Sequence, residues 1–256
     1  MAYKMRTIYF VGDAILDNFY WLNDKKRDLK EAVTSLGFNV INYAVDETKM
    51  SNIFSGIEPK DELKKSRLYP YPVQKDGKIY QIKSLLKFLE VHGSNKDDMV
   101  VLSIGGLDVQ ANGTKIFFGI DNMIGSMANE EFANTFKKLL KILCSKFDKV
   151  LLLSVYLPYL GTGASHGIYS PFCGVVVKKW AKFINSLAKE LGISILDINR
   201  MINPYDRTHY SQIDDTRIGD KISKCIAECI KVVNLNYEPG KVYYTKGLDY
   251  SKISVE

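Results

Sequence analysis

Short, almost wholly apolar runs recur along this chain, and amphipathic helical patterns separate them. The first run covers residues 8–11, and further runs lie at residues 99–104 and 149–156. Apolar runs of this length are typical of strands that are buried on both faces. Strands that alternate with helices form parallel sheets, which are covered by helices on both sides. The alternation therefore predicts an α/β protein.

Five strands are predicted from these runs and from two weaker segments, at residues 8–11, 38–45, 99–104, 149–156 and 193–198. Apolar residues spaced three and four apart predict helices at residues 23–36, 80–92, 132–143, 180–191 and 216–233. The expected fold class is a three-layer α/β/α sandwich around a five-stranded parallel sheet.

One domain is expected over residues 1–233, because a chain of 256 residues with 46% hydrophobic residues supports a single large core. Residues 57–80 hold three prolines and a turn at residues 75–78, which indicates a surface insertion. Residues 234–256 are rich in tyrosine, glycine and lysine. We interpret them as a C-terminal tail that packs on the body or contacts a partner.

The formal net charge of +6 is mild and its basic residues are scattered, which favours solvated helix faces over a nucleic-acid surface. The cysteines, at positions 144, 173, 225 and 229, lack zinc-site spacing and are interpreted as reduced core residues. No metal or cofactor is expected. No apolar run has the length of a membrane span, and no signal peptide precedes the first strand. These features predict a soluble protein of the cytoplasm or another reducing compartment.

Polar residues follow the predicted strands at the sheet edge where open α/β folds bind their ligands. The catalytic candidates are Asp13 after the first strand, Asp108 after the third, and His209 and Asp214 before the last helix. For each aspartate, capping of a following turn or helix is the alternative role. A Ser165–His166 pair and Cys173 are weaker candidates for nucleophilic chemistry, and His92 is expected to be solvated.

Three segments, in this order, resemble the sequence blocks of the SGNH/GDSL hydrolases. Residues 12–18, Gly-Asp-Ala-Ile-Leu-Asp-Asn, resemble the first block, which reads Gly-Asp-Ser. Residues 105–108, Gly-Gly-Leu-Asp, resemble the third block, Gly-x-Asn-Asp, and residues 210–219 resemble the last block, Asp-x-x-His-Pro. Block order and spacing agree over about residues 6–233. The resemblance implies an SGNH-hydrolase-like fold with flavodoxin-like strand order.

The resemblance also implies acyl-ester hydrolysis by a serine, a histidine base with its aspartate, and an oxyanion hole that includes an asparagine. This chain departs from the pattern at each of these positions. Ala14 stands in place of the serine, and Leu107 stands in place of the asparagine. Asp214 stands in place of the histidine, and Ser211 in place of its aspartate partner. The second block of the family contributes a glycine to the oxyanion hole, and Glu47 stands at that position. The pocket positions implied by the resemblance are Ala14, Glu47, Gly106, Leu107, Asp108, Ser211 and Asp214.

Two functions remain open. The departures favour a catalytically degenerate protein that acts in binding, scaffolding or assembly. Such a protein would contact a protein partner through residues 234–256 or 57–80. The alternative is a hydrolase of an ester, acetyl or carbohydrate substrate, with Asp13, Asp108, His209 and Asp214 in a rearranged acid/base site. Convergence of these side chains around an open pocket would favour the hydrolase.

Overall fold

The structure, a computed structural model, describes residues 5–19, 22, 28–58, 75–109, 127–156, 170–201 and 219–256. In these ranges a single sheet has the strand order β2-β1-β3-β4-β5-β6-β7. All neighbouring strands are parallel except β6 and β7, which are antiparallel. The strands are β1 (Thr7–Gly12), β2 (Asn39–Asn42), β3 (Met99–Ser103), β4 (Lys149–Leu153), β5 (Ser194–Leu196), β6 (Val242–Tyr244) and β7 (Ser254–Val255).

The predicted fold class is confirmed, because all five expected strands are present and follow the flavodoxin-like order 2-1-3-4-5. The count of five strands was wrong. Residues 234–256 contribute β6 and β7, which extend the sheet beyond β5. The domain boundary at residue 233 stays a prediction.

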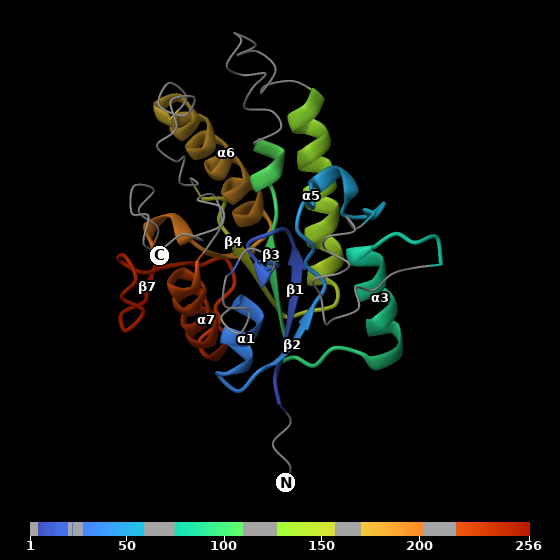
Figure 1. The fold of residues 1–256 in the computed structure, drawn as a ribbon, viewed down its shortest axis with the longest axis horizontal. Coiled ribbons are helices and arrows are strands. Elements are labelled where there is room, and N and C mark those ends of the chain that lie inside the picture. The colour runs from blue at the N-terminus through green and yellow to red at the C-terminus, as the bar shows by residue number, and fades with distance from the viewer. Residues whose placement is uncertain are drawn as a thin grey trace.

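Helices cover both faces of the sheet (Figure 1). The α-helices are α1 (Leu29–Thr34), α3 (Gln81–His92), α5 (Met127–Cys144), α6 (Ser170–Glu190) and α7 (Asp220–Leu235). Two short 3-10 helices, η3 (Met50–Asn52) and η4 (Ile198–Arg200), follow β2 and β5. Side chains of α3, α5 and α6 form one apolar core, and those of α1 and α7 form the other.

Alternate residues of each central strand face the two cores. In β1, Tyr9 and Val11 belong to the core under α3, α5 and α6, whereas Ile8 and Phe10 belong to the core under α1 and α7. Successive side chains of a strand point to opposite faces, so a strand covered on both sides is apolar at every position. This explains the near-continuous apolar runs of the sequence.

Three further predictions concern the proposed insertion, the cysteines and the absence of a membrane span. Ile57 and Ile79 form an antiparallel bridge at the two ends of the segment interpreted as an insertion, most of which lies outside the described residues. Cys225 and Cys229 are buried as expected, but Cys144 is exposed because it lies beside the apolar stripe of α5 rather than on it. No helix of the described ranges is long and apolar enough to cross a membrane.

Candidate functional site

The turn after β1 is fixed by Gly12 and Asp13. Gly12 has φ +129°, and a Cβ at this position would lie 1.7 Å from the Ser103 carbonyl oxygen of β3. The Asp13 N–H donates to the same carbonyl at 2.9 Å. The Asp13 carboxylate accepts the Ser103 hydroxyl at 2.6 Å and the Ile15 N–H at 3.2 Å, and only 3% of Asp13 is exposed. The turn therefore packs directly against the end of β3.

Ala14 is half-buried at the position that the resemblance assigns to the serine nucleophile. Its side chain is a methyl group and cannot attack a carbonyl carbon. Its N–H donates to no acceptor among the described residues, whereas the N–H groups of Asp13, Ile15 and Leu16 are all bonded. The position therefore lacks a nucleophile but keeps a backbone donor.

The turn after β2 carries Glu47, which is half-buried and has φ +69°. This is the left-handed region that glycine adopts without strain. The Glu47 N–H donates to Asp46 Oδ1 at 2.8 Å, and the Asp46 N–H donates to Asp17 Oδ2 at 2.7 Å. The backbone shape suits a glycine, although the residue is a glutamate.

The turn after β3 holds Gly105 and Gly106 against neighbouring elements. Gly105 has φ +101°, and its carbonyl accepts the indole N–H of Trp180 from α6 at 2.9 Å. A Cβ at Gly106 would lie 3.7 Å from Asp13 Oδ2, so this turn touches the turn after β1. Residues 106–109 are helical, and Leu107 is half-buried. A leucine side chain offers no hydrogen bond to an oxyanion.

Asp108 reaches across to η3. Both of its carboxylate oxygens lie 3.2 Å from the N–H of Met50, the first residue of that helix. Asp108 therefore caps a helix, as the alternative role anticipated, but one that precedes it by 58 residues. The pKa of Asp108 is raised to about 6, chiefly by burial and in smaller part by the negative charge of Asp13. The Met50 N–H and the charge of Lys49 act in the opposite direction.

The structure thus places Asp13 and Asp108 at one edge, where β1 and β3 end and where the strand order reverses. Ligands of doubly wound sheets bind at this reversal. Of the other predicted site residues, His209, Ser211 and Asp214 lie outside the described residues, as do Ser165 and His166. His92 is exposed at the far end of α3, with its ring 4.4 Å from that of Phe88.

Two buried residues that sequence reasoning did not assign hold the site together. The Asp17 carboxylate binds the Asp46 N–H, as described above. Asn18 donates from Nδ2 to Ser223 Oγ of α7 at 2.7 Å and accepts the Leu29 N–H of α1 at 3.0 Å. The signal in the sequence is a polar Asp-Asn pair directly after an apolar strand.

Gln81, the first residue of α3, is the third residue of this kind. Its Oε1 accepts the Gly12 N–H at 3.2 Å, and its Nε2 donates to Thr48 Oγ1. A buried glutamine is visible in the sequence only as a polar residue next to the apolar stripe of a helix. Its partners belong to turns that are distant in the chain.

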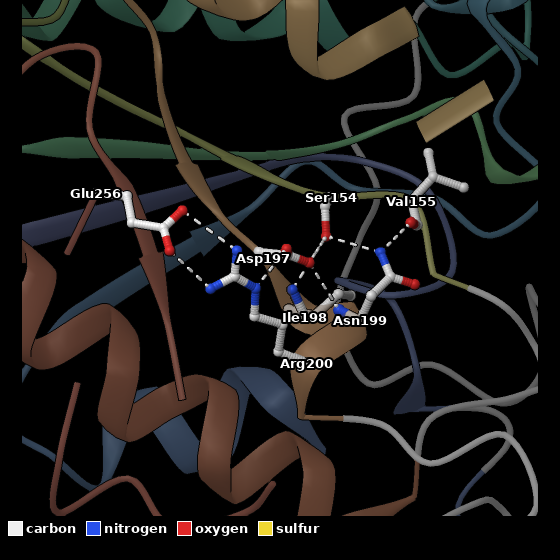
Figure 2. Close-up of polar contacts among 7 residues, drawn as sticks. All are labelled: Ser154, Val155, Asp197, Ile198, Asn199, Arg200 and Glu256. Carbon is white, nitrogen blue, oxygen red and sulfur yellow. Dashed lines mark hydrogen bonds and ion pairs between the residues drawn. The ribbon is translucent and has the colours of Figure 1, made fainter. Parts of the chain in front are cut away.

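A separate polar cluster lies at the ends of β4 and β5 (Figure 2). The Ser154 hydroxyl donates to Asp197 at 3.2 Å and accepts Asn199 Nδ2 at 3.3 Å. Arg200 pairs with both carboxylate oxygens of Glu256 at 3.1 and 3.2 Å, and its guanidinium lies 3.7 Å from the centre of the Tyr244 ring. These contacts fasten the C-terminal strands to η4.

A metal centre has no support in the described part of the chain, where no three His, Cys, Asp or Glu side chains are grouped to hold an ion. The chemistry that the described residues offer is that of two neighbouring carboxyl groups and one backbone N–H. Asp108, whose pKa is about 6, changes its protonation near neutral pH. A group of this kind suits general acid/base chemistry.

No family model and no curated protein matches this sequence. Solved structures do match it. A member of the lipolytic protein G-D-S-L family from Veillonella parvula has a TM-score of 0.54 at 13% identity, over 90% of this chain and 98% of its own. Est24, a carbohydrate acetylesterase from Sinorhizobium meliloti, has 0.52 at 14%, over 89% and 99%. Axe2, an acetylxylan esterase from Geobacillus stearothermophilus, has 0.53 at 12%, over 91% and 95%. The chain therefore has an SGNH/GDSL-hydrolase-like fold.

Proposed function

We propose that this chain hydrolyses acetyl-type esters and that carboxyl groups, in place of a serine, perform the acid/base chemistry. The observation that carries the proposal is Asp108, a carboxyl group with a pKa of about 6 beside Asp13 at the β1–β3 edge. The fold is shared with proteins named as a carbohydrate acetylesterase and an acetylxylan esterase, which supports acetylated carbohydrates as the substrate class.

The proposed reaction uses water as the nucleophile. Ionised Asp108 takes a proton from water, and the oxygen of that water attacks the acyl carbon. The Ala14 N–H donates a hydrogen bond to the carbonyl oxygen as it becomes negative. Protonated Asp108 then gives its proton to the alcohol oxygen while the ester C–O bond breaks. Asp13 assists because its negative charge makes Asp108 a stronger base.

Acetate release from an acetylated xylo-oligosaccharide, measured across the pH range around 6, tests this proposal. We expect kcat/KM to fall as the pH drops through the pKa of Asp108, because only the ionised carboxylate accepts a proton. Asp108→Asn keeps an acceptor for the Met50 N–H but cannot act as a base. It should lower kcat by about 10²–10⁴-fold.

Asp98→Asn is the matched control. Asp98 is also buried and also accepts backbone N–H groups, from Thr7 and Asn95, but it directly precedes β3, at the opposite edge of the sheet. Its replacement should leave kcat at the wild-type value. Wild-type turnover that survives in Asp108→Asn would overturn the assignment of the base, and the absence of wild-type turnover would overturn the hydrolase.

A second function, binding without turnover, is favoured by the side chains of Ala14 and Leu107. The first cannot attack an ester and the second cannot stabilise an oxyanion. In this case the protein would retain an acetylated sugar or a protein partner and release no acetate. Residues 57–80 and 234–256 remain the proposed contact surfaces for a protein partner. Equilibrium dialysis with the acetylated sugar, followed by an acetate assay, separates binding from hydrolysis.

A further inference from the structure

Gln81 links the turn that contains Ala14 to the turn that contains Glu47. Only 2% of this residue is exposed, and its side-chain amide lies between Gly12, at the end of β1, and Thr48, in the turn after β2. Thr48 is fully buried, and its hydroxyl donates onward to the Val45 carbonyl at 2.7 Å. The Val45 N–H in turn donates to the Gly12 carbonyl at 2.9 Å. These bonds form a closed ring.

The ring exists because β1 continues beyond the end of β2. Pairing with β2 ends at Phe10 and Asn42, whereas β1 runs on to Gly12. The N–H and C=O of a strand residue point to the same side, so the Gly12 N–H faces the β2 side of the strand. Gln81 Oε1 takes the place of the missing strand partner there. A buried N–H without an acceptor would be costly.

The same two turns are joined a second time, by the bond from the Asp46 N–H to Asp17. The two links lie on either side of Ala14 in sequence, at Gly12 and at Asp17. On the other turn, Asp46 and Thr48 flank Glu47. The links therefore fix the backbone on both sides of Ala14 and on both sides of Glu47.

We propose that Gln81 is a positioning residue that fixes the Ala14 N–H relative to the turn at Glu47. It thereby sets the distance between the two turns at the place where the carbonyl oxygen of the substrate binds. The inference rests on the proposed function. Gln81 does not touch the substrate in this scheme. It acts through Gly12 and Thr48, and its amide has the two functions that this role needs, one acceptor and one donor.

A double-mutant cycle with Gln81→Met and Thr48→Val tests the role. Both variants keep the side-chain volume nearly unchanged, and each removes the same amide–hydroxyl bond. We expect each to lower kcat for p-nitrophenyl acetate by about 10²-fold with KM unchanged, because misplacement by about 1 Å has such an effect. The double variant should be no slower than the slower single variant, because either substitution alone already opens the ring between the two turns.

Thr48→Ser keeps the hydroxyl and should retain wild-type kcat. Lys83→Gln, on the exposed side of the same helix, is the control for changes in α3 as a whole. The amide resonances of Ala14 and Glu47 provide a second readout that needs no turnover. They should shift in Gln81→Met and in Thr48→Val, and should stay in place in Thr48→Ser and Lys83→Gln.

Unmoved Ala14 and Glu47 resonances in Gln81→Met would overturn the positioning role, whether or not the protein melts at a lower temperature. Additive losses in the double variant would also overturn it. If the wild type shows no turnover, the hydrolase proposal fails on its own. The resonances still decide in that case whether Gln81 positions the two turns.

Discussion

Glu47 combines a residue and a backbone conformation that do not suit each other. Its φ of +69° places it in the left-handed region, which costs a residue with a Cβ about 1–2 kcal/mol. The second block of the SGNH pattern has a glycine at this position. The turn therefore retains the shape that a glycine would give, while the side chain adds strain and a negative charge to the edge of the site.

Glu47→Gly should relieve the strain, and Glu47→Ala should remove the carboxylate without relieving it. We expect the glycine variant to exceed the alanine variant in free energy of unfolding by about 1 kcal/mol, after allowance for the greater freedom of glycine in the unfolded chain. Urea unfolding of the two variants measures this difference. Equal stability would show that the φ of Glu47 is not strained.

Single residues also mark the limit of sequence reasoning at the site. Ala14, Leu107 and Asp108 are readable because they stand in short local blocks next to predicted strands. The roles of Asp17 and Gln81 are not, because their partners lie 29 and 69 residues away along the chain. Such a contact depends on how the strands are ordered in the sheet, and a local pattern carries no information about that order.

Among the elements, the C-terminal strands depart furthest from the sequence-based interpretation. The Tyr237 hydroxyl donates to the Val150 carbonyl at 2.9 Å and accepts the Val150 N–H at 3.1 Å. Val150 lies in β4 one residue before pairing with β5 begins, at Leu151. One tyrosine hydroxyl thus replaces a strand partner. The Tyr243 hydroxyl accepts the Glu238 N–H at 2.8 Å in a comparable way.

Tyr237→Phe should therefore destabilise the protein by about 1–3 kcal/mol, because it leaves the buried N–H and C=O of Val150 without their partner. Tyr250→Phe is the control, since Tyr250 is 37% exposed and its loss of a hydroxyl should have little effect. Thermal unfolding of both variants provides the measurement. Equal melting temperatures would mean that solvent satisfies Val150 in place of Tyr237.

The surrounding sequence, more than strand length, explains why β6 and β7 were missed and the first five strands were found, because β5 has three residues, as β6 does. β1, β3 and β4 each hold four consecutive apolar residues, and β5 lies in the apolar segment 193–198 next to a predicted helix, so these patterns stand out. β6 has three residues and β7 has two. Their identity as strands depends on pairing with β5, so composition alone gave a tyrosine-rich tail.

For the molecule as a whole, the sheet separates two cores and β5 depends on the C-terminal segment for its outer edge. Ile195 and Leu196 pair with Val242 and Tyr243 of β6. An uncovered apolar strand edge is a template for association with other chains. The arrangement links the stability of the central sheet to residues beyond the boundary that was predicted at residue 233.

A chain that ends after Leu235 tests that boundary. It keeps α7 but lacks β6, β7 and the Tyr237 contact. We expect it to associate in solution, because β5 becomes an open edge. Size-exclusion chromatography with light scattering reports the state of association. A monomer that melts like the full chain would support an independent domain over residues 1–233.

The parallel pairing of β5 with β6 also has a consequence for synthesis on the ribosome. All of the residues of β5 leave the ribosome before those of β6, and α7 lies between the two strands. At ordinary elongation rates the delay is roughly a few seconds. During this interval four of the five parallel strand pairs of the described sheet can form, and the outer edge of β5 is unpaired. Exposure of the β5 edge is thus a matter of time as well as of structure, and translation speed across α7 sets how long it lasts.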